Sequence, residues 1–194
     1  IPGEAVELGE EALDKPEFMR DGLQLRRVTN RNSPTVINAV FNVRNFWDGR
    51  ASRVFNGFSP SSDSPETPAI LVVSGGSLVG DFVRLDNASL ASQAVGPVLD
   101  GLEMSYEGRS WPKLGKKLLS LRPLALQRVA PDDSVLGSLA NPEGRGLRDD
   151  TTYLGLLQAA FQPELWQSSE VVASGFTQAE YNFPLFWGLA LMAY

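Results

Sequence analysis

The chain has 194 residues, 43% of them hydrophobic and 21% charged, which is the balance of an ordinary globular domain. Its 17 Lys and Arg against 23 Asp and Glu give a net charge of −6, which argues against a nucleic-acid-binding protein, and no apolar run approaches the roughly 20 residues that a membrane-spanning helix needs. The absence of Cys and His excludes disulfides, cysteine-held clusters and a Ser-His-Asp triad from this chain.

The beginning of the chain is predicted to be irregular up to a first clear helix start. Residues 1–31 are charged and lack a hydrophobic period, apart from a short predicted helix around 10–19. Ser33 followed by Pro34 is a good helix start, because a capping hydroxyl precedes a proline at the first helical position. The apolar residues that follow fall on one helical face: Val36, Ile37, Val40 and Phe41. The sequence therefore predicts a helix from residue 34.

A β-hairpin is predicted in the middle of the chain. Residues 55–68 are rich in Ser, Pro, Asp and Gly, a composition typical of a loop. Residues 69–85 then place two β-favouring arms around Gly75 and Gly76. Glycine accepts the positive φ angles that tight hairpin turns require, so this pair predicts the turn. We expect the hairpin to lie on the periphery.

Helices are predicted through the rest of the chain. One begins near Ser89 and runs through residue 94, and Ser110 is a candidate cap for a second. The second helix carries Trp111, Leu114, Leu118 and Leu121. Asp150 is a candidate cap for a third helix with a clear amphipathic pattern, formed by Tyr153, Leu156, Leu157, Ala160 and Phe161.

The last predicted helix is strongly apolar. Thr177 and Glu180 have the spacing of a capping box, and Pro184 is expected to bend or delay the helix that follows. Residues 183–194 are too few to span a membrane, so we expect a buried helix. A start at Ile1 and a close inside this apolar segment lead us to expect a fragment of a longer protein.

The generic catalytic motifs that we searched for do not predict a specific enzymatic function. The glycine-rich segments 75–80 and 115–117 lack the spacing of dinucleotide-binding and phosphate-binding loops. The carboxylate pairs Asp132-Asp133 and Asp149-Asp150 lie at loops or helix starts, where acids favour the helix dipole. A capping role is preferred for both pairs, and a catalytic role is the alternative.

Two segments carry a more specific signal. Residues 31–51 read RNSPTVINAVFNVRNFWDGRA, and residues 89–104 read SLASQAVGPVLDGLEM. In order and spacing they resemble the region between the two haem-attachment motifs of bacterial di-haem cytochrome c peroxidases and their MauG-like relatives. The resemblance implies a mainly α fold, a cytochrome-c-like helical domain with long loops, and residues 1–194 would be part of one such domain with 69–85 as an inserted hairpin.

The chain departs from compact members of that family in two ways. The stretch that separates the two motifs, with its hairpin, is long, which is more similar to an enlarged branch that includes surface-associated and rubber-oxygenase-like proteins. Both CxxCH motifs and every axial His are missing, and residues 21–29, where compact peroxidases have a distal His ligand, contain none. The distal side of that haem is therefore expected to be open, or to belong to a protein with altered activity.

The resemblance also implies roles for individual residues. Trp47 matches a tryptophan between the two haems, where an indole ring relays electrons; the alternative is an aromatic that fills the interdomain core. Asp48 and Arg50 are expected to form an ion pair or to contact haem propionates. Glu103 matches the carboxylate that moves a proton during peroxide cleavage, with a helix-start acid as the alternative.

Three further residues complete the implied site. Gln93 is expected to hydrogen-bond in the same pocket, and Pro97 to shape the turn beside it. Asn32 matches an amide of a calcium site between the haem domains, and oxygen ligation by Asn is chemically reasonable. A turn-forming Asn before Ser-Pro is the alternative for Asn32.

The function that we expect from these motifs belongs to a larger protein. This segment would contribute the distal-pocket carboxylate and the interhaem tryptophan to a c-type di-haem peroxidase-like oxidoreductase, and it would not be an enzyme as an isolated chain. A haem-bearing polypeptide with CxxCH motifs would supply haem c, an electron-donor protein would supply electrons, and calcium is a further expected cofactor. We expect a periplasmic, extracellular or cell-surface location. The alternative is a haemless binding or scaffold module that retains the fold.

Overall fold

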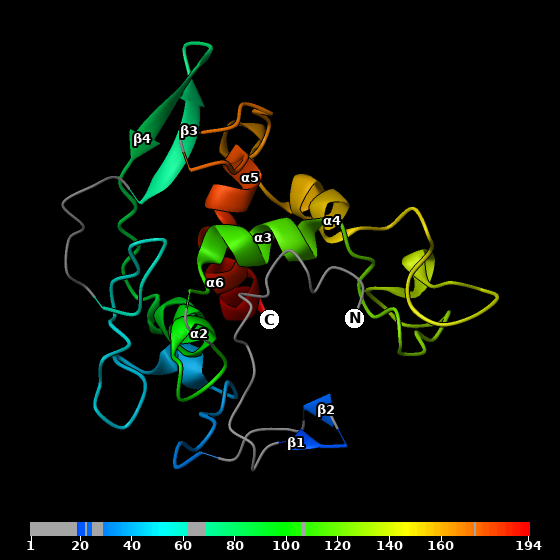
Figure 1. The fold of residues 1–194 in the computed structure, drawn as a ribbon, viewed down its shortest axis with the longest axis horizontal. Helices are drawn as coiled ribbons and strands as arrows, with labels where there is room; N and C mark the ends of the chain where they lie inside the picture. Colours follow the sequence, from blue (N-terminus) through cyan, green and yellow to red (C-terminus); the bar gives the residue numbers. More distant parts are fainter. Residues whose placement is uncertain (1–18, 22, 25–28, 62–68, 106–107, 173) are drawn as a thin grey trace.

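The computed structural model describes residues 19–21, 23–24, 29–61, 69–105, 108–172 and 174–194. Helices outweigh strands among the regular elements of these residues, as predicted (Figure 1). The α-helices are α2 (Ser89–Leu99), α3 (Trp111–Leu119), α4 (Tyr153–Ala160), α5 (Gln178–Tyr181) and α6 (Phe183–Ala193). Short 3-10 turns are η2 (Ala39–Phe41), η3 (Gly137–Leu139) and η4 (Pro163–Leu165). Two antiparallel pairs, β1 (Met19–Arg20) with β2 (Leu23–Gln24) and β3 (Ile70–Ser74) with β4 (Ser77–Asp81), complete the fold.

The hydrophobic core forms where α6 packs against α2 and α3. Helix α6 is apolar on nearly all sides, which is the pattern of a buried helix, and its first half is buried. The ring of Trp111 lies 6.2 Å from each of the rings of Phe183 and Trp187. The indole N–H of Trp187 donates to the carbonyl oxygen of Ala94 at 3.0 Å, so α6 is also tied to the backbone of α2. This pairing positions α2, which carries part of the candidate site.

The predicted hairpin is confirmed. Val72 pairs with Val79, and Gly75 and Gly76 form the turn with φ angles of 58° and 81°. The hairpin projects from the helical body at its turn end (Figure 1). Its base is held by α5 and α6, because the Asn182 side chain accepts from the Leu71 N–H at 2.8 Å and donates to the Leu71 carbonyl at 2.7 Å.

The helix predicted from residue 34 is wrong. The segment has no regular structure up to residue 36 and then forms only the turn η2, and Asn38 before this turn has a left-handed φ of 59°. Side chains of α2 take the carbonyl groups that a helix would use: Gln93 Nε2 donates to the Thr35 carbonyl at 3.0 Å, and Ser89 Oγ donates to the Asn42 carbonyl. Tertiary hydrogen bonds therefore override the local helix signal. The apolar residues of the predicted face are left exposed: Val36 at 42%, Ile37 at 78% and Phe41 at 82%.

The other helix predictions hold with changes at the ends. Helix α2 extends to Leu99, and α3 is capped by Ser110, whose oxygen accepts from the Lys113 N–H. Helix α4 begins later than predicted, because Thr152 and not Asp150 is the cap, accepting from the Gly155 N–H at 3.1 Å. A hydroxyl next to the first helical residue reaches the amide that Asp150 cannot.

The C-terminal prediction is confirmed in its main features. Thr177 and Glu180 form the capping box, with the Thr177 N–H 2.7 Å from Glu180 Oε2. The helix is interrupted at Asn182, and Pro184 lies in the first turn of α6. The described part of the loop at 55–68 is irregular, as predicted.

Two predictions about the fold are not tested by the described residues: the helix around 10–19 and the cytochrome-c-like arrangement. The helix predicted around 10–19 lies outside the described residues, except that Met19 belongs to β1, in a strand pair that the sequence did not indicate. In the part of the chain that the structure describes, no helix has the length and apolarity needed to cross a membrane. The finer expectation of a cytochrome-c-like arrangement stays a prediction.

Candidate functional site

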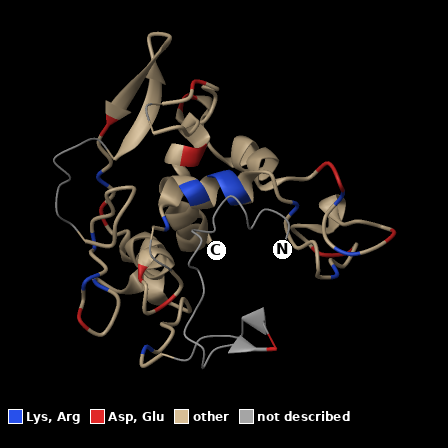
Figure 2. Ribbon diagram, in the orientation of Figure 1, with Lys and Arg blue, Asp and Glu red and all other residues tan. Residues whose placement is uncertain are grey.

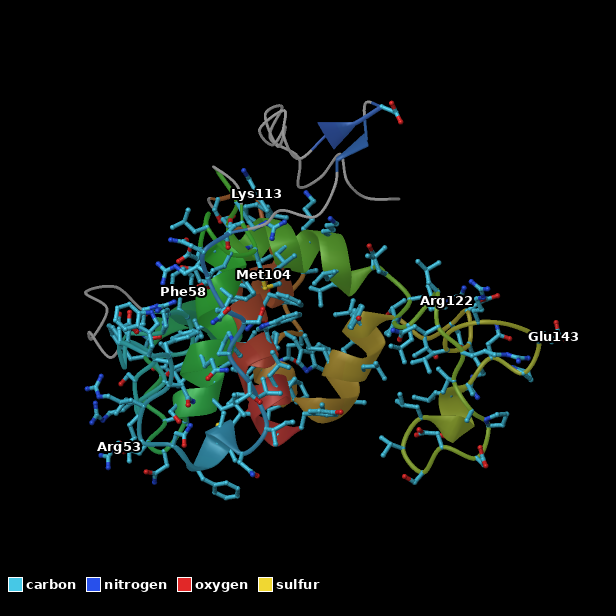
Figure 3. The ribbon with its side chains drawn as sticks, turned by 90° about the horizontal axis from the view of Figure 1, so that it is seen from below. Arg53, Phe58, Met104, Lys113, Arg122 and Glu143 are labelled. Atoms are coloured by element: carbon cyan, nitrogen blue, oxygen red, sulfur yellow. The ribbon has the colours of Figure 1, made fainter. Side chains whose placement is uncertain are left out.

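Two neighbouring pockets open beside α2, and together they are lined by the residues that the motifs single out. The larger has a volume of about 510 Å³ and is lined by Asn32, Gln93, Pro97 and Glu103 with Thr29, Arg31, Ser33, Pro34, Val36, Ala94, Met104 and Leu191. The smaller has a volume of about 370 Å³ and is lined by Asn30, Arg31, Asn32, Ser33, Pro34, Phe46, Trp47, Arg50 and Glu103. Glu103 lies in the wall that both pockets share. Met104, labelled in Figure 3, marks this region next to α2 and α6.

Helix α2 and the turn that follows it set the position of Glu103. Pro97 lies inside the last part of α2, directly before the turn that carries Glu103, and its expected role in shaping that turn stays a prediction. Its carbonyl accepts from the Asp100 and Met104 N–H groups, each at 3.2 Å. Helix α2 ends at Leu99, two residues after Pro97, and the compact turn that follows presents Glu103 to the pockets.

Gln93 ties the opposite wall to α2. Its side chain is 4% exposed, and its Nε2 donates to the Thr35 carbonyl at 3.0 Å. That bond holds the segment 29–36, which lines both pockets, against the helix. The Gln93 side chain therefore fixes the shape of the pocket with its amide nitrogen.

Arg50 lies between two carboxylates, and the predicted ion pair with Asp48 is confirmed. Its Nη1 lies 3.1 and 3.0 Å from the two Asp48 oxygens, and its Nη2 lies 3.3 Å from Glu103 Oε1. Its guanidinium stands 3.9 Å from the centre of the Phe46 ring, a cation–π distance. Desolvation raises the pKa of Asp48, but hydrogen bonds from the Arg50 backbone and side chain and the charge of Arg50 together bring it below its ordinary value.

Glu103 has one oxygen without a partner. Its side chain is 12% exposed; Oε1 faces Arg50, whereas Oε2 is buried and has no hydrogen-bond partner among the described residues. A buried carboxylate oxygen without a hydrogen-bond donor has a higher free-energy cost than a buried neutral polar group without a partner. A donor is therefore expected at this oxygen. Glu103 thus has one oxygen anchored by Arg50 and one buried oxygen without a donor in the wall of both pockets.

Trp47 packs into no core within the described part of the chain, and both the interhaem role and the alternative of filling an interdomain core stay predictions. It is 88% exposed at the edge of the smaller pocket. Four apolar residues earlier in the same segment are exposed as well, and we call the five side chains together the Trp47 surface: Val36, Ile37, Phe41, Val43 and Trp47. Where exposed apolar side chains adjoin one another, they are typical of a surface that another polypeptide covers.

Asn32 lies beside the two pockets, but the described residues do not support a calcium site there. Its side chain is exposed and lines both pockets. Within the described ranges, no group of three or more His, Cys, Asp or Glu side chains is placed to hold a metal ion. Calcium prefers several oxygen ligands, so one amide is not a site by itself.

The capping role preferred for the acidic pairs is confirmed for Asp133 only, whereas Asp149 and Asp150 form ion pairs and Thr152 caps α4. Asp133 Oδ1 accepts from the Val135 and Leu136 N–H groups at 2.9 and 2.7 Å, and these backbone hydrogen bonds lower the pKa of Asp133. Asp149 pairs with Arg122, and Asp150 lies 3.5 Å from Arg148. Acidic and basic positions both occur along residues 122–150 (Figure 2).

Sequence reasoning missed two residues and one contact of the site. Arg31 lines both pockets and Met104 lines the larger, although both lie inside the motif segments. Their presence in those segments was the available signal. The contact of Arg50 with Glu103 joins residues 53 positions apart, and no local pattern indicates it.

Comparison with known proteins shows a family match that includes the segments lining these pockets. A model of the di-haem cytochrome c peroxidase family matches residues 8–183, which is most of the chain and includes both motif segments. No curated protein and no solved structure matches the chain with significance.

Proposed function

The chain belongs to the di-haem cytochrome c peroxidase family, and on that premise we propose that it forms one wall of a haem pocket in which peroxide is reduced. The family depends on haem c, whereas this chain contains neither Cys nor His. The thioether attachments and the His ligands must then come from a haem-bearing polypeptide with CxxCH motifs, on another segment or another chain. The isolated chain would not be an enzyme.

The pocket residues suit a haem that is attached elsewhere. Arg31 and Arg50 bring guanidinium groups that match the carboxylate geometry of haem propionates. Pro97, Val36 and Leu191 offer apolar contacts for the macrocycle. When bound, the haem supplies the iron and the electrons for cleavage of the peroxide bond. Oε2 of Glu103, buried and without a described partner, is a group that a bound molecule would satisfy.

Glu103 is the proposed proton-transfer group. Peroxide cleavage requires a proton to move from one peroxide oxygen to the other as the bond breaks, and a carboxylate in contact with both oxygens can accept and return it. The chain has no His for this task. The single observation that carries the proposal is the buried, unpartnered Oε2 of Glu103 in the wall of both pockets.

The Trp47 surface is the proposed contact with the haem-bearing polypeptide. Covering it would remove a large apolar area from water, which favours association. Trp47 would then lie between the haems, where its indole ring relays electrons that an electron-donor protein delivers. We place the complete protein in the periplasm or at the cell surface, in an enlarged branch of the family that carries the β3–β4 insertion, and calcium near Asn32 remains a further proposal.

A haemless binding module is the second candidate function. It is favoured by the same exposed Trp47 surface, since a scaffold would use that surface for a protein partner without any haem. A pyridine-haemochrome assay together with the intact mass of the complete native protein separates the two. Haem c in the complete protein supports the peroxidase function, and its absence supports the scaffold.

The test of the proposed chemistry is Glu103→Gln in the complete haem protein. The amide keeps the size and the hydrogen bonding but cannot exchange a proton, so peroxide turnover should fall at least about tenfold, within the roughly 10²–10⁴-fold typical of acid–base groups. The matched control is Glu143→Gln, an exposed carboxylate that lies far from Met104 in Figure 3. Haem content should be unchanged in both variants, and normal turnover in Glu103→Gln would make Glu103 structural.

A further inference from the structure

Arg50 is shared by two carboxylates of very different surroundings, and this arrangement points to a task for it. Asp48 stands close in sequence on the same turn, whereas Glu103 belongs to the turn after α2. We propose that Arg50 is the positioning residue of the Glu103 carboxylate, and that Asp48 and Phe46 hold Arg50 in place for that task. The inference rests on the proposed function, because the carboxylate that is positioned is the proposed proton-transfer group.

Three contacts fix the Arg50 guanidinium before it reaches Glu103. Nη1 faces both Asp48 oxygens, and the Arg50 backbone N–H donates to Asp48 Oδ1 at 3.2 Å. The guanidinium lies over the Phe46 ring at 3.9 Å. That ring is itself wedged against α2, since a Cβ added at Gly96 would come within 3.2 Å of it. Arg50 is therefore oriented by neighbours that do not include Glu103.

The orientation leaves Nη2 free of Asp48 and directed to Glu103. Nη2 meets Oε1 at 3.3 Å, and this ion pair is the one that reaches into the pocket, because the Arg50 and Glu103 side chains are only 28% and 12% exposed. With Oε1 engaged, rotation of the carboxylate is restricted, and Oε2 is buried without a partner among the described residues. The pair thus distinguishes an anchored oxygen, Oε1, from a second oxygen, Oε2, that Arg50 does not neutralise.

This task requires arginine and not merely a positive charge. A guanidinium is planar and presents N–H groups in a fixed fork, so one nitrogen can face Asp48 while the other faces Glu103. A lysine ammonium is a single point of charge on a flexible chain. Placed here, it would pair with Asp48, the nearer carboxylate in sequence and the one that already receives most of the Arg50 hydrogen bonds.

The experiment compares Arg50→Lys with the double variant Arg50→Lys/Asp48→Asn in the complete haem protein. Infrared difference spectra at constant pH, with the Glu103 carboxylate bands assigned by subtraction of Glu103→Gln, report whether Oε1 is hydrogen-bonded. We expect the bands to shift in Arg50→Lys and to return toward the wild type in the double variant, where Asp48 no longer competes for the ammonium. The kcat for peroxide should fall at least about fivefold in the single variant, recover in part in the double variant, and the KM should change little.

The outcomes separate the inference from the proposed function. Unshifted Glu103 bands in Arg50→Lys overturn the inference, whatever the kcat. Shifted and restored bands with an unchanged kcat sustain the positioning by Arg50 and refute the acid–base role of Glu103. A band shift that the double variant does not restore shows that Asp48 does not hold Arg50, and that part of the inference fails. If Arg50→Lys does not accumulate as a haem protein, Asp48→Asn alone is informative, because loosening Arg50 must still shift the Glu103 bands.

Discussion

Helices α2 and α6 both line the larger pocket, and Gly188→Ala tests how closely the two helices are packed. A Cβ at Gly188 would lie 2.8 Å from Cζ of Phe55 and 3.2 Å from the carbonyl oxygen of Ala91 in α2. Phe55 is 0% exposed, so its ring has nowhere to move without displacing its neighbours. Carbon atoms in contact prefer about 3.5–4.0 Å, so α6 must shift away from α2 by several tenths of an ångström or more.

The expected magnitude follows from two opposing effects. Overpacking of a filled core costs about 1–3 kcal/mol, whereas replacing a helical glycine by alanine returns roughly 0.5–1 kcal/mol. We expect a net loss of about 1–2 kcal/mol in the free energy of unfolding, measured by urea denaturation with the wild type in parallel. The matched control is Gly155→Ala in α4, where the nearest atom to the new Cβ is Thr152 Oγ1 at an ordinary 3.6 Å, so this variant should gain stability. A Gly188→Ala protein as stable as Gly155→Ala would refute the close packing.

Three further predictions concern other parts of the molecule. The pKa of Asp133 is lowered in the folded protein, so its ionised form stabilises the fold at pH values above the ordinary pKa of 3.8, and this contribution is lost as the pH falls through the lower pKa of the folded state. Asp133→Asn should therefore lose less stability in acid than the wild type, as measured by urea denaturation across that pH range. Asn182→Leu should cost about 1–3 kcal/mol, because the Leu71 N–H loses this partner while the Leu71 carbonyl keeps the bond from Gln178 Nε2; hydrogen exchange at the Leu71 amide should accelerate, and protection equal to the wild type would contradict the clamp. In the complete protein, Trp47→Phe should keep the fold but slow interhaem electron transfer in rapid-mixing spectroscopy, and equal rates would reduce Trp47 to a packing role.

Local signals in the sequence predicted the elements that depend on few residues. The turn of Gly75 and Gly76 between β-favouring arms, and the capping box of Thr177 and Glu180, are complete within a short window, and both are confirmed. The helix expected from residue 34 failed because Gln93, far along the chain, captures the Thr35 carbonyl. Such a bond has no local signature, and it outweighs the modest helix propensity of the segment.

The site was predicted from motif order more than from physical pattern. The two motif segments named the residues that the fold brings to the two pockets, because the turn after Pro97 and the segment before η2 face each other. The environment of each residue was not predictable. Glu103 shares Arg50 with Asp48, and Trp47 is exposed, since these depend on which elements meet across the fold.

The central claim is that a haem of another segment or chain lies against this pocket wall. A structure of the complete, haem-loaded protein tests it most directly. We expect a haem edge beside Glu103, Pro97 and Arg31, and we expect the polypeptide that carries the CxxCH motif to cover the Trp47 surface. A haem that lies elsewhere, with Glu103 Oε2 bonded only within this chain and Trp47 still facing water, would contradict it.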